Sequence, residues 1–364
     1  MNIMYRSSME EKIVFVLAGG TLGHINPALV ISEMFYLDGY KVYFISSEKF
    51  ANTNYFEGKK YLSKVYYLPS QGFSRRYLFK NIKSFVLNVK VYKTIRNLIK
   101  TYKPKFILGM GGSISTLGIL SGKRAKIPMA IHEQNAIMGL GNKIVFNKVD
   151  KVFTGYDYKS DKMIFVGNPL ESVSYSNRRL RNNRNVLVFG GSNGSTYMND
   201  FIIDNANIFT KYNIERVYLI VGRKYYEENK NKLALISGKN SFLEIISETN
   251  QMEKYYNDSF LVISRGGAGA ISEIIGYKKL ALIIPSPNVT KNHQYYNALY
   301  FKEKNCLELI EEKTLSKENF IDAIDKLINN SDIYYKSIEH NNYYFSKYIM
   351  YDEITKLMEV KSNE

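Results

Sequence analysis

The chain has 364 residues, which is enough for two domains that each bury a core of their own. Hydrophobic residues make up 45% and charged residues 23%, the composition of a soluble globular protein. The single cysteine, Cys306, excludes an intrachain disulfide and a thiolate metal cluster. The formal net charge of +16 predicts an anionic partner, namely nucleic acid, anionic lipid or a phosphorylated substrate. A nucleotide bias toward Lys, Asn and Tyr codons would explain part of this charge.

The first twenty residues do not have the pattern of a signal peptide, because two glutamates precede a short apolar run that enters a glycine turn. The longest uncharged stretch, residues 106–122, is interrupted by Gly and Ser, so it is predicted to form strand, loop and helix. Together with the lone cysteine, these features predict a cytoplasmic protein without a membrane span.

Apolar runs alternate with helical-period segments along nearly the whole chain, which predicts parallel α/β sheets. The predicted strands are Ile13–Leu17, Lys41–Ile45, Lys64–Tyr67, Phe106–Leu108, Met129–His132, Lys151–Phe153, Val186–Phe189, Val217–Val221, Phe242–Ile246, Phe260–Ile263 and Ala281–Ile284. Asn26 and Pro27 predict the start of the first helix, and Gly39 predicts its end.

The segments "IVFVLAGGTLGH" and "NVLVFGGSNGS" are the same device, a strand entering a glycine turn and then a helix. They predict two similar doubly wound domains in tandem, residues 1–168 and 169–342. Residues 166–185 have no periodicity and are predicted to link the two. The helical tail, residues 343–364, is expected to pack back on the first domain.

Three glycine turns follow predicted strands, where backbone N–H groups at a helix start can approach an anion. Neither of the first two has the pattern G-x-G-x-x-G, and no acidic residue closes the second strand, so dinucleotide binding is disfavoured. The third turn, Ser264 to Ala270, would leave N–H groups that suit a diphosphate. Glu273 either accepts hydrogen bonds from a ribose or only complements the helix dipole, and both interpretations stay open.

Histidine placement points to a second kind of chemistry. His24 closes the first glycine turn at the carboxyl edge of a strand, where a neutral imidazole can act as a general base. The tetrapeptide His132, Glu133, Gln134 and Asn135 ends an apolar strand, which favours a binding role for the cluster, with a structural role preferred for His132 itself.

Two absences and one basic segment limit the function class. No Asp-x-Asp triplet and no Gly-x-Ser-x-Gly elbow occur, so neither carboxylate-held metal nor hydrolase chemistry is indicated. Residues 73–100 mix basic and apolar side chains and predict either a core helix with a solvated face or a membrane-binding patch. The patch residues are Arg75, Arg76, Leu78, Phe79, Lys80, Ile82, Lys83 and Phe85.

These motifs, in this order, resemble the MurG family of glycosyltransferases. The matching stretches are "GGTLGHINPAL", "GMGGSIST", "IHEQNAIMGLGNK", "VGNP", "GGSNGS", "SRGGAGAISE" and "NHQYYNA", which run from residue 19 to residue 298. The resemblance implies an α/β protein with the GT-B fold: two Rossmann-like, doubly wound domains that face each other across a cleft. The N-terminal domain would face the acceptor and the membrane, and the C-terminal domain would bind UDP-GlcNAc.

The resemblance also implies roles for individual residues. His24 would be the catalytic base of an inverting transfer, without a cofactor or a metal. UDP-GlcNAc would be bound by Thr21, Leu22, Gly23, Asn135, Ser192, Ala268, Gly269, Ala270, Glu273 and Gln294. Four further residues, His132, Glu133, Gln134 and Asn297, would line the acceptor side of the site.

The implied reaction moves GlcNAc from UDP-GlcNAc to the muramyl 4-hydroxyl of an undecaprenyl-linked acceptor (lipid I), which gives lipid II for peptidoglycan. The implied place is the cytoplasmic face of a bacterial cell membrane, where the protein would be peripheral and bound to anionic lipids. Cell-wall and division proteins are further candidate partners, and nucleic acid is not expected. The alternatives are a GT-B lipid glycosyltransferase with a diacylglycerol acceptor and a UDP-GlcNAc 2-epimerase-like isomerase.

Three positions depart from the family pattern. Leu170 and Glu171 follow "GNP" where the family usually has an arginine near the phosphates, a role that Arg178, Arg179 or Arg265 would have to fill. Ser113 stands where an aromatic residue often follows the second turn, and "YKKL" replaces the "GLP" expected before a late strand.

Overall fold

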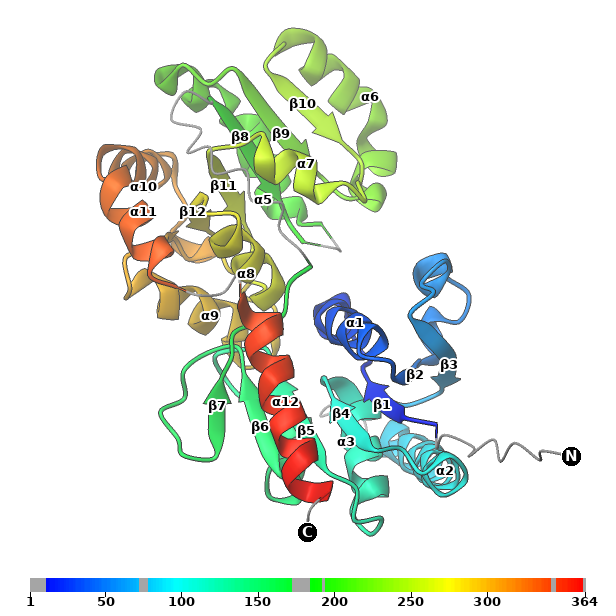
Figure 1. Ribbon diagram of the computed structural model, residues 1–364. Coiled ribbons are helices and arrows are strands. Elements are labelled where there is room, and N and C mark those ends of the chain that lie inside the picture. Colours follow the sequence, from blue (N-terminus) through cyan, green and yellow to red (C-terminus); the bar gives the residue numbers. More distant parts are fainter. Residues whose placement is uncertain (1–10, 72–77, 172–183, 192–193, 342–344, 363–364) are drawn as a thin grey trace, which may run out of the picture. The chain divides into compact units, whose positions relative to one another are not determined.

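The computed structural model describes residues 11–71, 78–171, 184–191, 194–341 and 345–362, with only the backbone described for residues 78–83 and 362. The chain forms two compact units (Figure 1). Unit 1 contains the residues up to Glu133, Met138–Pro169 and the residues from Lys347 onward, and unit 2 contains Gln134–Ile137 and Leu170–Ser346. The chain therefore crosses from one unit to the other at several points.

Unit 1 is built on a seven-stranded parallel sheet with the strand order β3-β2-β1-β4-β5-β6-β7. Its strands are β1 Ile13–Leu17, β2 Lys41–Ser47, β3 Leu62–Leu68, β4 Phe106–Gly109, β5 Met129–Glu133, β6 Lys151–Thr154 and β7 Met163–Phe165. Its helices are α1 Leu22–Leu37, α2 Leu78–Tyr102, α3 Gly112–Gly122, α4 Leu140–Val145 and α12 Ser346–Ser362. Short 3₁₀ turns lie at η1 Glu48–Phe50, η2 Asn54–Phe56 and η3 Phe146–Lys148.

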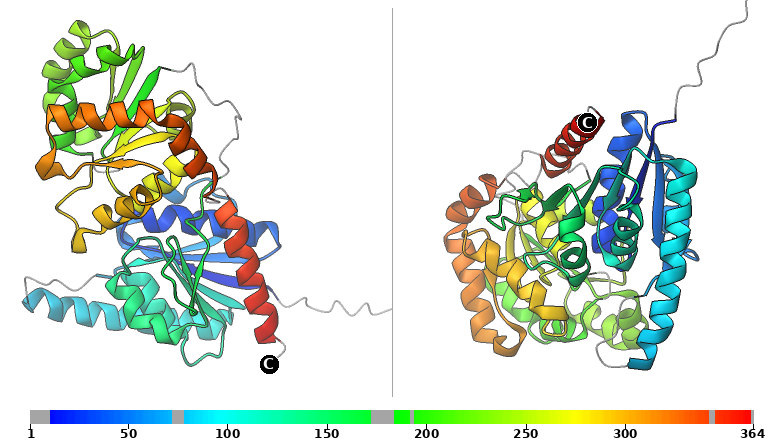
Figure 2. Two further views of the ribbon diagram at one scale, coloured as in Figure 1. Left: turned by 90° about the vertical axis from the view of Figure 1, so that its left-hand side faces the viewer. Right: turned by 90° about the horizontal axis from the view of Figure 1, so that it is seen from below.

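Both faces of this sheet are covered, which explains why its central strands, such as β1 and β4, are apolar throughout rather than alternating. Val14 and Val16 of β1 pack on one face with α1 and α12, and Phe15 packs on the other face with α2 and α3. Figure 2 shows α12, in red, along this unit. Its residues Met350 and Ile354 complete the core on the α1 side.

Helix α1 begins five residues before the predicted start, since its cap is Thr21 instead of Asn26. Asn26 and Pro27 were expected to open the helix, but it starts at Leu22 and Pro27 lies inside it. The prediction was wrong because the N–H groups of His24 and Ile25 already bond to the carbonyl of Thr21, which closes the first turn upstream. The predicted end is confirmed, since Gly39 has a φ of +79° and its N–H bonds to the carbonyl of Tyr36.

Unit 2 repeats the same plan with six parallel strands in the order β10-β9-β8-β11-β12-β13. Its strands are β8 Asn185–Phe189, β9 Arg216–Ile220, β10 Leu243–Ile246, β11 Leu261–Ser264, β12 Leu280–Ile283 and β13 Glu308–Leu309. Its helices are α5 Thr196–Asp204, α6 Arg223–Lys239, α7 Met252–Asn257, α8 Ala268–Gly276, α9 His293–Lys302, α10 Lys317–Asn329 and α11 Ser331–Glu339. The 3₁₀ turns are η4 Ala206–Tyr212, η5 Thr290–Asn292 and η6 Glu312–Thr314.

The order of connection reverses between β1 and β4 in unit 1 and between β8 and β11 in unit 2. In open parallel sheets this switch point is where loops at the carboxyl ends of strands leave room for a ligand. The prediction of two doubly wound parallel domains is confirmed. The short strands β7 and β13 had not been predicted.

Helix α2 carries the basic segment. It runs for 25 residues, and Val91, Ile95 and Ile99 of its second half are buried against the sheet of unit 1. Within the described part of the chain, no helix combines the length and apolar character needed to cross a membrane.

A buried lysine lies at the amino edge of the sheet in unit 2, just before β12. Lys279 is only 8% exposed, and burial lowers the pKa of its amine from 10.5 to about 8, an effect that the charge of Asp258 opposes. Asp258 is itself held by the Asn185 amide at 3.0 Å and by the Tyr218 hydroxyl. A charged ammonium in this place therefore costs folding free energy.

Replacing this lysine should stabilise the protein at neutral pH. We expect Lys279→Met to raise the free energy of unfolding at pH 7 by about 1–3 kcal/mol. Since the folded pKa is depressed, the penalty on the wild type is complete below pH 8 and fades as the pH approaches 10.5. Urea denaturation at pH 7 and pH 9.5 measures this, with the neighbouring Lys278→Met as the matched control. Equal stabilities of the two variants at pH 7 would contradict the prediction.

Candidate functional site

In unit 1, His24 lies at the switch point of the sheet. It is the third residue of α1, half-buried, and its Nδ1–H donates a hydrogen bond of 2.8 Å to the carbonyl of Gly19 in the first glycine turn. With Nδ1 as the donor, the lone pair of the neutral ring is on Nε2. The local fold therefore fixes both the orientation of the imidazole and the nitrogen that can accept a proton.

The second glycine turn, after β4, holds the other side of this imidazole. A Cβ on Gly111 would lie 2.5 Å from Cδ2 and 2.9 Å from Nε2 of His24, and Gly111 has a φ of +111°. A Cβ on Gly112 would lie 2.4 Å from the carbonyl oxygen of Gly19. Only glycine allows the two turns to approach so closely. The next residue, Ser113, shares a 2.8 Å hydrogen bond with the Ser70 hydroxyl.

Two residues of the predicted cluster hold the backbone of unit 1. His132 is fully buried, its Nε2–H donates to the carbonyl of Gly167 at 2.9 Å, and burial lowers its pKa to about 4. The carboxylate of Glu133 accepts hydrogen bonds of 2.8 Å from the Gly139 N–H and from the Asn142 amide. His132 is therefore a neutral residue joining β5 to the segment after β7, and Glu133 shapes the loop before α4.

The next residues of the cluster belong to unit 2. Gln134 is buried, and Asn135 is half-buried beside the fully buried Asn297 of α9. The Asn297 amide donates to Asn135 Oδ1 at 3.2 Å and to the Gly266 carbonyl at 3.1 Å, and its Oδ1 accepts from the Ala136 N–H at 2.8 Å. Asn297 thus fastens this segment to the third glycine turn.

The third turn opens directly onto α8. Gly267 is the N-cap, so the N–H groups of Ala268, Gly269 and Ala270 are first-turn donors without an intrahelical acceptor. A Cβ on Gly266 would lie 2.3 Å from the carbonyl oxygen of Gln294. Apart from the chain neighbours and the backbone of α8 itself, no described heavy atom lies within 4 Å of a Cβ built on Gly267 or Gly269. The turn is therefore tight on the α9 side and open at the start of the helix.

Glu273 lies one turn further along α8 in a perturbed environment. Its Oε2 accepts a 2.9 Å hydrogen bond from the hydroxyl of Tyr256, which is fully buried and stacked on Tyr277. Burial raises the pKa of the Glu273 carboxyl from 4.5 to about 7; the charge of Glu171 adds to the rise, and the Tyr256 hydrogen bond opposes it. Glu171, in place of the arginine expected after "GNP", thus adds negative potential at Glu273.

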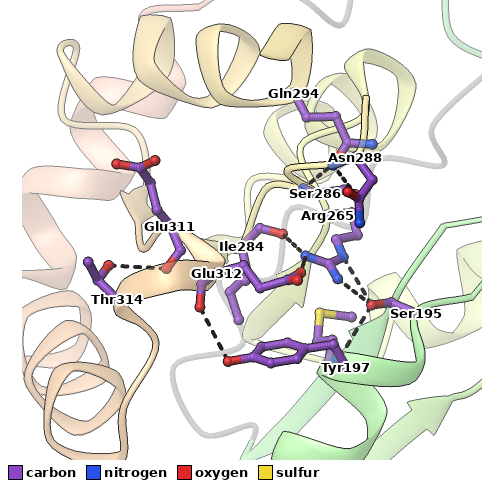
Figure 3. Close-up of polar contacts among 11 residues, drawn as sticks. Ser195, Tyr197, Arg265, Ile284, Ser286, Asn288, Gln294, Glu311, Glu312 and Thr314 are labelled. Carbon is purple, nitrogen blue, oxygen red and sulfur yellow. Dashed lines mark hydrogen bonds and ion pairs between the residues drawn. The ribbon is translucent and has the colours of Figure 1, made fainter. Parts of the chain in front are cut away.

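The amide of Gln294 is also held in one orientation, as Figure 3 shows. Its Oε1 accepts from the N–H of Ser286 at 2.8 Å, which leaves the Nε2 amide group as the donor. Ser192, Arg178 and Arg179 lie outside the described residues.

Of the predicted patch on α2, only part can be placed. Arg75 and Arg76 lie outside the described residues, as do the side chains of Leu78, Phe79, Lys80, Ile82 and Lys83. Phe85 is 59% exposed and Val86 is 53% exposed. Leu140 and Ile144 of α4 are exposed as well.

Each unit therefore gathers part of the predicted set. Unit 1 brings Thr21, Leu22, Gly23 and His24 to the switch point between β1 and β4. Unit 2 joins Asn135 and Asn297 to the turn that precedes α8, with Gln294 and Glu273 on the adjoining helices. The sequence had not indicated Gly111 beside His24, Tyr256 beside Glu273 or Ser286 beside Gln294. For Gly111, the signal that could have found it was its place in the quoted "GMGG" turn.

Comparison with known proteins agrees with this architecture. Residues 14–154 match the N-terminal domain of glycosyltransferase family 28, and residues 185–350 match its C-terminal domain. A crystal structure of MurG from Acinetobacter baumannii superimposes with a TM-score of 0.74 at 20% identity, covering 95% of this chain and 99% of that one. The two parallel-sheet domains thus have the GT-B fold of nucleotide-sugar glycosyltransferases.

Curated relatives identify the family of glycosyltransferases to which the chain belongs. The UDP-N-acetylglucosamine–N-acetylmuramyl-(pentapeptide) pyrophosphoryl-undecaprenol N-acetylglucosamine transferase of Oenococcus oeni is 30% identical over 334 residues, 86% of this chain and 88% of the relative. The enzyme of the same name from Caldicellulosiruptor saccharolyticus is 31% identical over 353 residues, 92% of this chain and 93% of the relative. The chain belongs to this family, the MurG family of glycosyltransferase family 28.

The pKa of Glu273 makes a prediction about stability. Since its carboxyl keeps a proton up to about pH 7 in the fold but loses it near 4.5 when unfolded, ionisation penalises the folded state increasingly between those values. We expect Glu273→Gln to raise the free energy of unfolding at pH 8 by about 1–3 kcal/mol and to change it little at pH 5. Urea denaturation at the two pH values checks this, with the exposed Glu303→Gln as control. A gain of equal size at both pH values would contradict it.

Proposed function

We propose that the protein transfers GlcNAc from UDP-GlcNAc to the muramyl 4-hydroxyl of lipid I and so makes lipid II for peptidoglycan. The relatives of the MurG family carry this activity in their names, and they align with this chain over most of both lengths. In the geometry of the site, the observation that carries the proposal is the imidazole of His24, locked by two glycine turns with its Nε2 lone pair defined.

Unit 2 would bind the sugar nucleotide. The first-turn N–H groups of Ala268, Gly269 and Ala270, with Ser192, would hold the phosphates at the positive end of α8. Glu273 would accept hydrogen bonds from the ribose hydroxyls, and the Gln294 amide would donate to GlcNAc hydroxyls. Asn135 and Thr21 to Gly23 would complete the sugar site, and His132, Glu133, Gln134 and Asn297 would support the acceptor side.

The chemical step would be one inverting displacement. His24 Nε2 accepts the proton of the muramyl 4-hydroxyl while that oxygen attacks the anomeric carbon of α-linked GlcNAc. The bond from the anomeric carbon to the phosphate oxygen breaks, and its electron pair leaves with UDP. Backbone N–H groups at the start of α8 stabilise the negative charge that develops on the diphosphate. The product is a β-1,4 linkage.

The first experiment measures UDP release from UDP-GlcNAc and a water-soluble, short-chain lipid I analogue in the presence of EDTA. We expect acceptor-dependent release, and a fall in kcat of about 100-fold or more for His24→Ala because the attacking hydroxyl loses its base. His340→Ala, a histidine at the exposed end of α11, is the matched control.

Two further arms separate the alternatives. Release of UDP with a diacylglycerol acceptor but not with the lipid I analogue would show that the acceptor is diacylglycerol instead of lipid I. Epimerisation of UDP-GlcNAc without any acceptor would show that the protein is an isomerase and not a transferase.

We also propose that unit 1 binds the cytoplasmic face of the cell membrane through exposed apolar residues of α2 and α4, two helices that pack into the same core cluster of this unit. Phe85 and Val86 expose apolar surface on α2, which is rich in lysine, and Leu140 and Ile144 expose apolar surface on α4. Apolar side chains that dip among headgroups within a basic rim are typical of interfacial binding to anionic lipids.

The double variant Phe85→Glu/Val86→Glu should lose binding to vesicles that contain phosphatidylglycerol, because it places two carboxylates among anionic headgroups. Cosedimentation measures this, and UDP binding should stay unchanged. Leu235→Glu on α6, which is 68% exposed in unit 2, is the matched control. If the double variant sediments like the wild type, the patch is not the membrane contact.

A further inference from the structure

The guanidinium of Arg265, the residue after β11, joins three other segments of unit 2 (Figure 3). Its Nε–H and Nη2–H donate to the Ser195 hydroxyl oxygen at 3.1 and 2.5 Å. Its Nη1 donates to the carbonyl of Ile284 at 3.1 Å and lies 2.5 Å from a carboxylate oxygen of Glu312. All three partners of the guanidinium are therefore distant from Arg265 in the sequence.

These partners mark the carboxyl ends of neighbouring strands. Ser195 is the N-cap of α5 after β8, Ile284 follows β12, and Glu312 begins η6 after β13. Because β8, β11, β12 and β13 are adjacent in the sheet, a single side chain ties together the loops at one edge. The planar fork of an arginine can reach a hydroxyl, a carbonyl and a carboxylate at once, which the point charge of a lysine cannot.

The pairing with Glu312 limits what Arg265 can do. Its side chain is only 9% exposed and that of Glu312 is 16% exposed, so the two charges neutralise each other largely away from water. A buried charge of this kind is tolerated only with such a partner and with further hydrogen bonds. In this structure all three nitrogens of the Arg265 guanidinium are therefore bound to these loops.

The network also decides what the Ser195 hydroxyl can do. Its oxygen already accepts hydrogen bonds from Nε–H and Nη2–H of Arg265 and from the N–H of Met198 at 3.3 Å, which together occupy its lone pairs. A hydroxyl has two lone pairs and one hydrogen, so the hydrogen is what Ser195 has left to offer. As the N-cap of α5, the residue is half-exposed.

We propose that Arg265 is a positioning residue: held by Glu312, it fixes the turns after β8 and β11 and makes the Ser195 hydroxyl a donor to the diphosphate of the sugar nucleotide. This inference rests on the proposed function, because it assumes that the nucleotide binds at these turns. It predicts that loss of the Arg265–Glu312 pair weakens contacts to phosphate and leaves contacts to the nucleoside unchanged.

The test compares the dissociation constants of UDP and uridine by calorimetry. Glu312→Gln keeps the shape of the side chain but removes the charge that holds Arg265. We expect the Kd of UDP to rise about ten-fold while that of uridine stays constant. If Arg265 instead contacts phosphate directly, its release from Glu312 should tighten UDP binding, so the sign of the change separates the two roles.

Three further variants complete the design. Glu311→Gln is the matched control, since its carboxylate pairs with Lys313 on the surface. Arg265→Lys should bind UDP more weakly than the wild type, because an ammonium cannot reach all three acceptors. Ser195→Ala should raise the Kd of UDP but not that of uridine. Because this variant keeps the Arg265–Glu312 ion pair, it still tests the proposal if Glu312→Gln does not fold.

The outcomes are distinguishable from failure of the proposed function. A wild-type protein that does not bind UDP would refute the proposed function itself. A wild type that binds UDP, with a Glu312→Gln variant that binds it equally well but has a lower Tm, would show that the pair is merely structural and would overturn the positioning role.

Discussion

The site depends on one steric constraint, the absence of Cβ atoms where backbone turns meet at the carboxyl ends of the strands. The ring of His24 occupies the volume that a side chain at Gly111 would need, and the second turn approaches the carbonyl of Gly19 to a distance that only a glycine permits. In unit 2, Gly266 allows α9 to approach the third turn in the same way. The glycines thus act as spacers that let neighbouring elements hold functional groups.

Buried polar side chains do the complementary work of fixing these turns. His132 holds a backbone carbonyl from a neutral, fully buried position, Asn297 connects two loops through both ends of its amide, and Arg265 connects four strand ends. Each is costly to bury unless its hydrogen bonds are made, so each specifies one arrangement of loops. This leaves the more exposed groups, His24, Glu273 and Gln294, on a rigid support.

The sequence predicts most of the architecture because parallel strands covered on both faces are apolar throughout, as in Ile13–Leu17. The strands β7 and β13 were missed because three and two residues carry no periodic signal of their own. The start of α1 was predicted wrongly from Asn26 and Pro27, because capping preference is a local property. In the structure the first turn already closes on the carbonyl of Thr21. The pairs Arg265–Glu312 and Tyr256–Glu273 join residues far apart in the chain, and no local pattern marks them.

The docking of α12 on unit 1 has a consequence for biosynthesis. The core beneath α1 includes Phe35 from the start of the chain and Met350, Ile354 and Leu357 from its last helix, with Tyr351 against the Phe35 ring at 5.2 Å. A ribosome that has completed the sheet of unit 1 has not yet made this helix, because residues Leu170–Ser346 of unit 2 are translated in between. Unit 1 therefore completes its core only after most of unit 2 has been synthesised, and the apolar surface that α12 covers stays exposed during that interval.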